Sequence, residues 1–236
     1  MKLSIVIPVR NESATITKLI ERVREVDCGM PKELIVVDGA STDGTQDLLR
    51  TLGEAPDLVL VFEDAARGKG RAVRTGFERA TGDIVMVQDA DLELDPSEIP
   101  SLLAPILDGE TDIVLGSRFK GRGRGTAPFV SYLGNKGLTW TANVLFLAHL
   151  TDLLTCYKVM RAEVAAGLDL RGSGFDVDAE IPCRLLRDGR RIVEVPVTYE
   201  PRGEDDGKKL TRGVGWSVLQ AILRVRFGRR TRAVEA

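Results

Sequence analysis

The sequence predicts an α/β domain built on a mostly parallel sheet flanked by helices, followed by a C-terminal extension. Short apolar runs rich in β-branched residues alternate with stretches of helical spacing, which indicates parallel strands joined by helices. These runs are apolar almost throughout, as in strands covered on both faces. A chain of 236 residues with 43% hydrophobic content is long enough to bury a sizeable core as one domain.

The predicted strands occupy the first half of the chain. They are LSIVIPV at 3–9, ELIVVD at 33–38, LVLVF at 58–62, DIVMVQD at 83–89 and DIVLGS at 112–117. Helix starts are indicated by Ser13, by Ser41 with Thr42, and by Asp95 before Pro96. Asp95 therefore has an explanation as a helix cap, and we do not count it as a site residue.

The second half of the chain is less regular. A loop rich in glycine and arginine begins at Gly121, and a long apolar helix is expected from about Val130 to Leu150. The sheet is expected to resume in RRIVEVPVTYE at 190–200. We expect residues 1–210 to form the main domain and residues 211–236 to form a C-terminal amphipathic helix with an arginine-rich tail.

Composition excludes several classes of protein. The 33 basic and 35 acidic residues nearly cancel, so the overall charge indicates no nucleic-acid partner. Cys28, Cys156 and Cys183 lie far apart without a C-x-x-C pair, which predicts buried thiols and no disulfide or zinc site. No apolar stretch reaches the roughly 20 residues of a membrane span, and no secretory signal is evident. We expect a protein of the cytoplasm or of the cytoplasmic face of a membrane.

A cluster of acids follows the fourth predicted strand, in GDIVMVQDADLELDP at 82–96. Residues two apart in a strand point the same way, so Asp89 and Asp91 can converge at its carboxyl end. Ligands collect at that edge of open α/β sheets, and a small set of carboxylates suits Mg²⁺ or Mn²⁺ carrying a phosphate. Glu93 could add a third oxygen. The alternative for such a short D-x-D motif is a solvated turn.

Six segments give these acids a context. SIVIPVRNE, IVVDGASTDGT, GKGRAVRTGFERATGD, VQDADLE, GSRF and TDLLTCYKVMR occur in the order seen in family 2 nucleotide-sugar glycosyltransferases. The chain resembles the branch that includes dolichol-phosphate mannose synthases and bacterial polyprenyl-phosphate sugar transferases, from Ser4 to about Lys209. The resemblance implies a GT-A fold, a nucleotide-diphosphate sugar donor, and Mg²⁺ or Mn²⁺ held by Asp89, Asp91 and Glu93, with Asp89 also contacting the nucleotide.

The same resemblance implies a nucleotide pocket. Pro8 and Glu12 would line the nucleoside site, and Asp38 would contact the base or ribose. Arg10 stands where many members have an aromatic residue, and VDGAS stands where many have VDDGS. A guanidinium can also stack on a base, so Arg10 can take the aromatic's place. Lys69 in RGKG would lie near the pyrophosphate; the alternative is a loop that merely starts a helix.

A phosphate acceptor changes what catalysis requires. A phosphate monoester carries about −1.5 to −2 charge at neutral pH and can attack without a base, so cations must hold two anions together. Arg118, Arg202, Lys208 and Lys209 match family positions that face donor or acceptor phosphates. We therefore predict Asp91, Arg118, Arg202 and Lys209 as the catalytic set; the alternative for each cation is a solvated surface group.

Four other polar residues have competing interpretations. Asp152 would be a base if the acceptor were a hydroxyl, or it would orient a loop, which we favour. His149 falls in the apolar helix and is expected to be a packed or edge residue. Asp178 and Glu180 lie in a matching family segment but could equally start a helix.

The last predicted helix, GVGWSVLQAILRVRF at 213–227, places Val214, Val218 and Ile222 at four-residue intervals and is followed by arginines. A basic amphipathic helix suits the surface of an anionic membrane. The alternative is a docking helix with an arginine-rich tail. We expect any membrane contact to be peripheral.

The leading prediction is an inverting, metal-dependent glycosyltransferase that moves a sugar from GDP-mannose or a UDP-sugar to polyprenyl or dolichyl phosphate. The same chemistry on a hydroxyl acceptor, or a non-catalytic nucleotide-binding module, are the alternatives. A dinucleotide-dependent oxidoreductase would need G-x-G-x-x-G after the first strand, which PVRNESAT does not provide.

Overall fold

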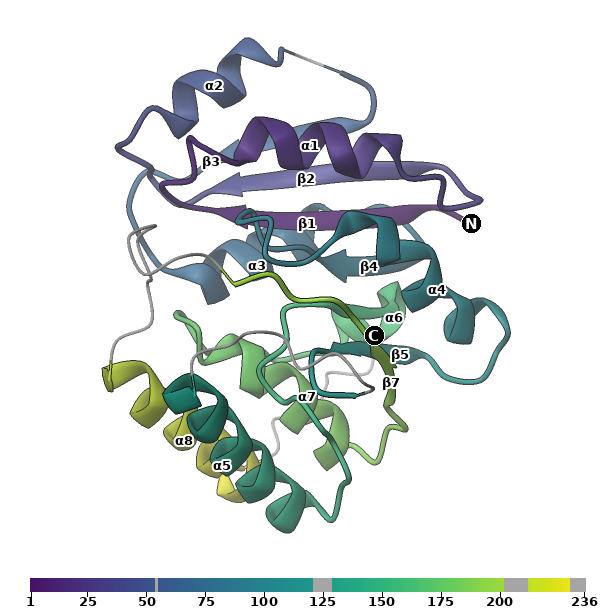
Figure 1. Cartoon of the computed structure of the whole chain (residues 1–236), viewed down its shortest axis with the longest axis vertical. Helices are drawn as coiled ribbons and strands as arrows, with labels where there is room; N and C mark the ends of the chain where they lie inside the picture. The colour runs from purple at the N-terminus through teal and green to yellow at the C-terminus, as the bar shows by residue number, and fades with distance from the viewer. Residues whose placement is uncertain (54, 121–128, 202–211, 230–236) are drawn as a thin grey trace.

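In the part of the chain that the structure describes, seven strands form one sheet in the order β3-β2-β1-β4-β6-β5-β7, with helices on both faces (Figure 1). The computed structural model describes residues 1–53, 55–120, 129–201 and 212–229. The strands are β1 (Leu3–Val9), β2 (Lys32–Asp38), β3 (Leu58–Phe62), β4 (Ile84–Val87), β5 (Ile113–Ser117), β6 (Lys158–Arg161) and β7 (Val193–Pro196). The helices are α1 (Ile16–Glu25), α2 (Thr45–Thr51), α3 (Lys69–Arg79), α4 (Ile99–Leu107), α5 (Phe129–Phe146), α6 (Ala162–Ala166), α7 (Val177–Arg187), α8 (Arg212–Phe227) and the 3₁₀ helix η1 (Pro96–Glu98).

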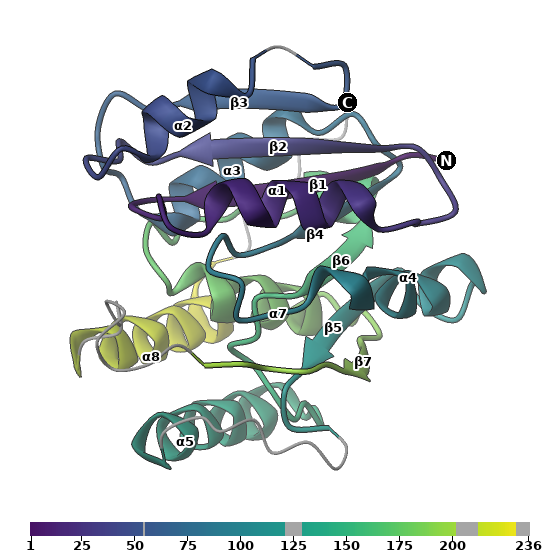
Figure 2. The ribbon, with the colours of Figure 1, turned by 45° about the horizontal axis from the view of Figure 1, so that its top comes forward.

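Strand direction confirms the predicted mostly parallel sheet. Of these seven strands, β6 runs against both of its neighbours, β4 and β5, and the others share one direction. Figure 2 shows β6 between β4 and β5. β6 was not predicted from the sequence, because its four residues, KVMR, begin and end with charged side chains and form no apolar run.

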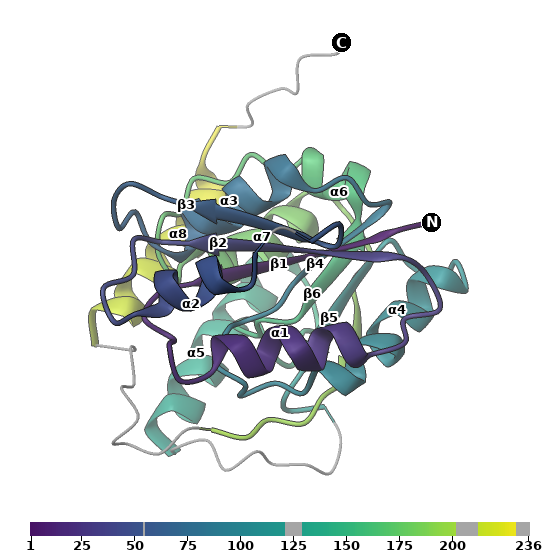
Figure 3. The ribbon, with the colours of Figure 1, turned by 90° about the horizontal axis from the view of Figure 1, so that it is seen from above.

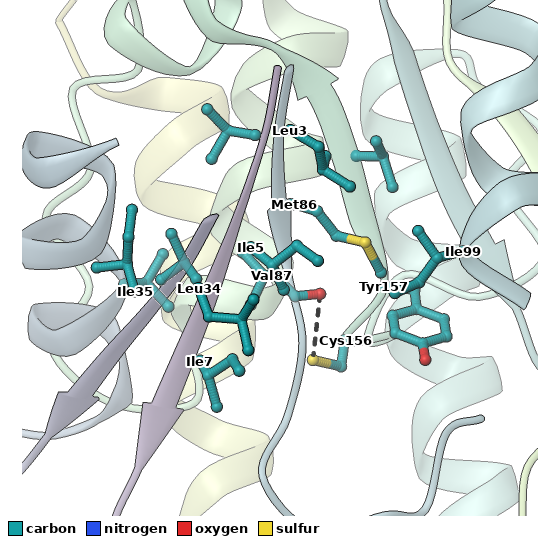
Figure 4. Packing of buried hydrophobic residues seen from close by; sticks show 14 of the residues in the cluster. Leu3, Ile5, Ile7, Leu34, Ile35, Met86, Val87, Ile99, Cys156 and Tyr157 are labelled. Atoms are coloured by element: carbon teal, nitrogen blue, oxygen red, sulfur yellow. Dashed lines mark hydrogen bonds between the residues drawn. The ribbon is translucent and has the colours of Figure 1, made fainter. Parts of the chain in front are cut away.

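The core explains why the predicted strands are apolar throughout. Figure 3 shows α1 and α4 on one side of the sheet and α3 and α6 on the other. Every residue of β1 is buried. Ile5 of β1 lies beside Met86 of β4 in the sheet register, and both are buried in one core with Leu3, Val87 and Tyr157 (Figure 4). The three cysteines are buried and free, as predicted.

A second apolar cluster joins α5, α7 and α8. Val218, Ile222 and Val225 of α8 are buried there with Ala142 of α5 and Cys183 of α7. The predicted boundary between residues 210 and 211 lies outside the described residues and stays a prediction. Over the part of the chain that the structure describes, no helix is both long and apolar enough to cross a bilayer.

The helix predicted to end at Leu150 is shorter than expected. α5 ends at Phe146, and Leu147 then takes a φ of 54°, which a helix cannot accommodate. The side chain of Asn143 binds the backbone N–H and carbonyl of Leu150 at 2.9 and 2.8 Å, which fixes the turn that follows. His149 is therefore exposed in a loop, outside the helix where it was predicted.

The predicted helix starts are only partly correct. Asp95 does act as a cap, because its Oδ1 accepts a hydrogen bond from Ser97 N at 2.9 Å at the start of η1. Ser13 lies three residues before α1, which begins at Ile16 without a side-chain cap.

Candidate active site

Four predicted site segments meet at one edge of the sheet. β1, β2 and β4 are parallel, and β6 is antiparallel to both β4 and β5, so β1, β2, β4 and β5 all end on the same side. Arg10, Asp38, Asp89 and Arg118 stand at or just after these four ends. Strand order reverses between β1 and β4, where open α/β sheets bind their ligands.

The loops at this edge have unusual backbone conformations. Asn11, Ala40 and Leu92 follow β1, β2 and β4, and their φ angles are 55°, 55° and 61°. Non-glycine residues adopt such angles at a cost, and they gather at binding sites. Asn11 also joins two of the loops, because its N–H donates to Ser41 Oγ at 2.9 Å and its Oδ1 accepts from Thr42 N at 2.8 Å.

Asp38 provides the clearest feature of the predicted nucleoside pocket. Its side chain is fully buried, and its Oδ2 accepts hydrogen bonds from Ser41 N at 3.0 Å and Gln46 Nε2 at 2.6 Å. Its Oδ1 has no hydrogen-bond partner among the described residues. A buried carboxylate oxygen without a donor is costly, so a ligand hydroxyl or N–H would be favoured there. Pro8 is buried in β1 and Arg10 is exposed directly after it.

Glu12 connects this pocket to the acids after β4. The residue is 8% exposed, and its N–H donates to Thr45 Oγ1 at 2.9 Å. The hydroxyl oxygen of Thr15 lies 3.2 Å from Glu12 Oε2 and 2.8 Å from the carbonyl oxygen of Ala90. Ala90 stands between Asp89 and Asp91, so the loop after β1 contacts the backbone of the D-x-D motif.

A row of alternating charges lies beside that motif. The ammonium of Lys69, the first residue of α3, is 2.8 Å from Asp89 Oδ1 and 2.9 Å from Asp178 Oδ2. Asp178 Oδ1 accepts a further hydrogen bond from Lys158 Nζ at 2.8 Å. The Lys158 side chain is 0% exposed, and those of Lys69 and Asp178 are each 10% exposed. The row joins β4, α3, α7 and β6.

Mutual attraction keeps Lys69 and Asp178 charged in spite of burial. Burial lowers the pKa of Lys69, but the charges of Asp178 and Asp89 outweigh it and hold that pKa well above its ordinary value. Burial raises the pKa of Asp178, but Lys158 and Lys69 outweigh it and lower that pKa. Lys69 is therefore a fixed cation next to Asp89 at neutral pH.

The glycines of RGKG allow this contact. Gly68 has a φ of +88°, and a Cβ on it would overlap the carbonyl oxygen of Ser173. A Cβ on Gly70 would overlap the carbonyl oxygen of Gly172, and Gly70 N donates to Ser173 O at 2.8 Å. Both glycines thus let α3 pack closely on residues 172–174, just before α7. The structure therefore gives both glycines a role in packing.

The three predicted metal ligands are not gathered into one cluster. Asp91 Oδ1 accepts a hydrogen bond from Glu93 N at 3.2 Å, while Glu93 Oε2 accepts one from Tyr199 OH at 2.9 Å. Among the residues that the structure describes, no group of three or more His, Cys, Asp or Glu could hold a metal. Two carboxylates still fit Mg²⁺, which binds one or two of them together with phosphate oxygens and water.

Arg118 is held in place by Asp152. Its Nε and Nη2 donate to the two carboxylate oxygens of Asp152 at 2.7 and 2.9 Å, and its guanidinium lies 5.2 Å from the centre of the Tyr199 ring. Asp152 is 0% exposed and also accepts from Asn135 Nδ2 at 2.9 Å. Burial raises the pKa of Asp152, but Arg118 outweighs it and the pKa is lowered. Asp152 therefore orients Arg118, whereas the sequence had favoured a role in orienting a loop.

Tyr199 and Lys158 are site residues that the sequence analysis missed. Tyr199 links Glu93 on the acid side to Arg118. Lys158 pairs with Val87, the last residue of β4, in the sheet register. The buried position of Lys158 in β6 explains its role, because an ammonium in a buried strand requires a carboxylate, but the mixed segment TCYKVM gave no apolar run to mark that strand. Arg202 and Lys209 lie in 202–211, outside the described residues, and stay predictions.

Residues 4–167 match the sequence model of the family described as Glycosyl transferase family 2. The chain belongs to glycosyl transferase family 2. The predicted family is therefore confirmed, and the chain is a glycosyltransferase by family.

Curated relatives of this glycosyltransferase include three that match most of the chain. The undecaprenyl-phosphate mannosyltransferase of Micrococcus luteus is 31% identical, over 93% of this chain and 92% of its own length. The dolichol-phosphate mannosyltransferase of Pyrococcus furiosus is 32% identical over 88% of this chain, and a low-salt glycan biosynthesis hexosyltransferase of Haloferax volcanii is 31% identical over 94%. The chain spans 59% and 53% of the length of these last two relatives.

Solved structures confirm the GT-A fold. The glucosyl-3-phosphoglycerate synthase of Mycobacterium tuberculosis, in complex with Mg²⁺ and UDP, superposes on the glycosyltransferase with a TM-score of 0.75 at 22% identity. The match covers 98% of this chain and 81% of the synthase. The same synthase in complex with Mn²⁺, UDP and phosphoglyceric acid gives a TM-score of 0.72 at 24% identity. At this level of identity the likeness concerns the fold.

Proposed function

We propose that this glycosyltransferase moves a sugar from a nucleotide-diphosphate donor to polyprenyl phosphate, with inversion at the anomeric carbon. The observation that carries the proposal is the meeting of Asp38, Asp89, Asp91 and Arg118 at one edge of the sheet, where a donor and an anionic acceptor could both bind. Two of the relatives are named as mannosyltransferases acting on dolichol phosphate or undecaprenyl phosphate, which supports this class of acceptor.

The donor would lie over the ends of β1, β2 and β4. Asp38 would accept a hydrogen bond from the nucleoside through its unpaired Oδ1. Arg10 would cover the base, with Pro8 and Glu12 forming the wall of the pocket. The pocket is consistent with either GDP-mannose or a UDP-sugar, and the names of the two mannosyltransferases favour mannose as the sugar.

Asp89 and Asp91 would hold Mg²⁺ or Mn²⁺ together with the donor diphosphate. The bound ion would stabilise the negative charge that develops on the departing nucleoside diphosphate. The synthase structures with Mg²⁺ or Mn²⁺ and UDP support a divalent ion in this fold. Lys69, already fixed beside Asp89, would contribute a second positive charge to the same diphosphate.

Asp152 favours a phosphate acceptor over a hydroxyl acceptor. A hydroxyl needs a base to remove its proton, whereas a phosphate monoester does not. Both oxygens of Asp152 are engaged by Arg118, the residue is buried, and its pKa is lowered, so it is a poor base. Arg118 would hold the acceptor phosphate, with Arg202 and Lys209 as further predicted phosphate contacts.

The transfer would be a single displacement. An oxygen of the acceptor phosphate forms a bond to the anomeric carbon while the bond from that carbon to the donor's β-phosphate oxygen breaks. The bonding electron pair leaves with the nucleoside diphosphate, and the anomeric configuration inverts. No proton has to be removed from the attacking phosphate oxygen.

A transfer assay with a matched pair of acceptors tests this function. Labelled GDP-mannose or UDP-glucose is incubated with Mn²⁺ and either undecaprenyl phosphate or undecaprenol. We expect a lipid-linked sugar from the phosphate alone.

Asp91→Ala should lower the rate by about 100-fold or more, the scale of losing one transition-state electrostatic contact. Asp95→Ala is the matched control, because this acid caps η1 in the same loop and should leave the rate nearly unchanged. Sugar on undecaprenol, or equal losses in both variants, would overturn the proposal.

A further inference from the structure

The ammonium of Lys69 contacts both carboxylate oxygens of Asp89. Its Nζ lies 2.8 Å from Oδ1 and donates a hydrogen bond to Oδ2 at 3.1 Å. Asp89 is also one of the two acids that would hold a divalent ion, since Mg²⁺ in proteins binds one or two carboxylates together with phosphate oxygens. The same carboxylate thus binds a cation of the chain and would bind the ion that the transfer uses.

Lys69 is held close to Asp89 by its surroundings. Its side chain is only 10% exposed, and the ammonium also lies 2.9 Å from Oδ2 of Asp178. The ring of Phe175 lies beneath the same ammonium, with its centre 5.7 Å away. Because Lys69 is enclosed in this way, it stays beside Asp89 when a second cation approaches that carboxylate.

A divalent ion on Asp89 would be repelled by Lys69. Two cations that share one carboxylate repel each other, and the repulsion is strong where little water separates them. The side chain of Asp89 is 26% exposed and that of Lys69 is 10% exposed, so water covers the pair only in part. The ion alone should therefore bind weakly as long as Lys69 remains on Asp89.

A diphosphate would relieve this repulsion, because it offers Lys69 another anion. An ammonium has three N–H groups. Lys69 could turn those that face Asp89 toward phosphate oxygens and keep its contact with Asp178. Asp178 is a stable support for this change, since its Oδ1 lies 2.8 Å from Nζ of Lys158, whose side chain is 0% exposed. After the exchange each of these buried charges still has a partner of opposite sign, as buried charges require.

We propose that Lys69 is an internal counter-ion of Asp89, which makes the divalent ion and the donor diphosphate bind together. Lys69 neutralises Asp89 until the diphosphate arrives, and it then releases that carboxylate to the ion. The proposal deepens the proposed function and rests on it for the identity of the two ligands. It differs from a simple phosphate contact, because it gives Lys69 an effect on the ion when no nucleotide is present.

Thermodynamic linkage makes this effect measurable. If the nucleotide raises the affinity for the ion by some factor, the ion raises the affinity for the nucleotide by the same factor. Repulsion between Lys69 and the ion supplies part of that factor in our proposal. A protein without the ammonium should therefore bind the ion alone more tightly and show a smaller factor.

Mn²⁺ binding to the full chain tests the proposal without turnover. The electron paramagnetic resonance signal of free Mn²⁺ is followed for the parent and for Lys69→Met, with and without GDP or UDP. Asp178 keeps Lys158 in this variant, so the variant should fold, which its urea transition checks. We expect Mn²⁺ alone to bind at least about tenfold more tightly to Lys69→Met than to the parent, because an opposing charge beside its ligand is gone. The factor by which the nucleotide raises Mn²⁺ affinity should fall. Should Lys69→Met not fold, Lys69→Gln takes its place.

Arg71→Met is the matched control. Arg71 lies two residues further along α3, and its ion pair is with Glu63 at 3.8 Å instead of with Asp89. The change removes one positive charge from the same helix, from a side chain that is 37% exposed. Mn²⁺ should bind this variant within about twofold of its affinity for the parent, because solvent screens an exposed charge.

Three results would overturn the proposal. They are an unchanged Mn²⁺ affinity in the folded Lys69 variant, equal gains in the Lys69 and Arg71 variants, and a parent that binds Mn²⁺ as tightly without nucleotide as with it. A loss of nucleotide affinity with no change for Mn²⁺ alone belongs to the first result, since Lys69 would then be a phosphate contact only. The comparison uses no acceptor, so it is independent of the transfer assay. Sugar found on undecaprenol would overturn the proposed function and leave the effect of Lys69 on Mn²⁺ intact.

Discussion

Buried carboxylates hold the cations of the site in place before any ligand binds. Asp178 lies between Lys69 and Lys158, and Asp152 binds Arg118 through both oxygens. Cations fixed in this way need no reorganisation when negative charge develops, which is the arrangement that stabilises transition states best. The acids that do not touch the substrate in our proposal thus determine where the cations lie.

Replacing Asp178 should show how strongly the molecule depends on this arrangement. Asp178→Asn leaves Lys158, which is 0% exposed, without its carboxylate. Removing one partner of a buried ion pair costs about 3 to 5 kcal/mol. We expect a loss of about 3 kcal/mol in the free energy of unfolding, measured in urea at pH 7, because the remaining amide oxygen still accepts a hydrogen bond.

Asp169→Asn is the control for that change. Asp169 pairs with Arg171 at 2.8 Å, but both side chains are about half exposed, at 47% and 50%. Exposed pairs contribute about 1 kcal/mol or less. Equal losses in the two variants would mean that the Asp178 pairs contribute no more than a surface pair.

The sequence predicted Asp89 from its place after an apolar strand, and it predicted Asp38 and Arg118 from the resemblance to the family. The structure places all three at one sheet edge. Lys158 and Tyr199 were missed, because their partners are more than 15 residues away in sequence and only the fold brings them together. The metal site of Asp89, Asp91 and Glu93 stays a prediction, because the described residues contain no cluster of three such acids that could hold a metal.

At the scale of elements, the contact between α3 and residues 172–174 positions Lys69. Gly70→Ala should disturb it, since the new Cβ would also lie 2.8 Å from the carbonyl carbon of Gly172. Backbone cannot yield as a side chain does, so we expect a loss of about 1 to 3 kcal/mol in unfolding free energy. Nucleotide affinity, measured by calorimetry, should fall in the same variant.

Gly137→Ala is the matched helical control with the opposite expected sign. Gly137 lies inside α5, and a Cβ there would meet nothing within 4 Å. Alanine is favoured over glycine in a helix by up to about 1 kcal/mol, so this variant should be slightly more stable than the parent. A Gly70→Ala protein as stable as the parent would show that the segment can move aside.

Elements with long apolar runs were predictable, and short ones with mixed composition were not. β1 and β2 are buried at nearly every residue, so their patterns are unambiguous. β6 pairs antiparallel with both β4 and β5. Its four residues show no alternation or apolar run, so this pairing is what makes the segment a strand. Tertiary contacts, which sequence patterns do not reveal, decide such elements.

At the scale of the whole molecule, a buried acid holds together the edge opposite the site. Glu33 Oε2 accepts from Lys2 Nζ at 2.6 Å, and Oε1 accepts from Ser4 Oγ at 2.6 Å and Thr81 N at 2.8 Å. These contacts join β1, β2 and the turn before β4. Burial alone would raise the pKa of Glu33, but the hydrogen bonds outweigh it and lower the pKa from 4.5 to about 2.

This lowered pKa predicts how stability should depend on pH. A carboxyl group with a lower pKa in the folded state stabilises the fold above its unfolded pKa, and that stabilisation is lost as the pH falls through the folded value. For Glu33 the window runs from pH 4.5 down to about 2. The shift corresponds to at most about 3 kcal/mol.

In urea unfolding, Glu33→Gln should therefore lose the most unfolding free energy relative to the parent at pH 7, and the difference should shrink between pH 4.5 and 3. Glu21→Gln, on the exposed side of α1, should change stability by less than about 0.5 kcal/mol at either pH. A gap between Glu33→Gln and the parent that stays constant from pH 7 to pH 3 would show that the ionised carboxylate of Glu33 does not hold this edge together.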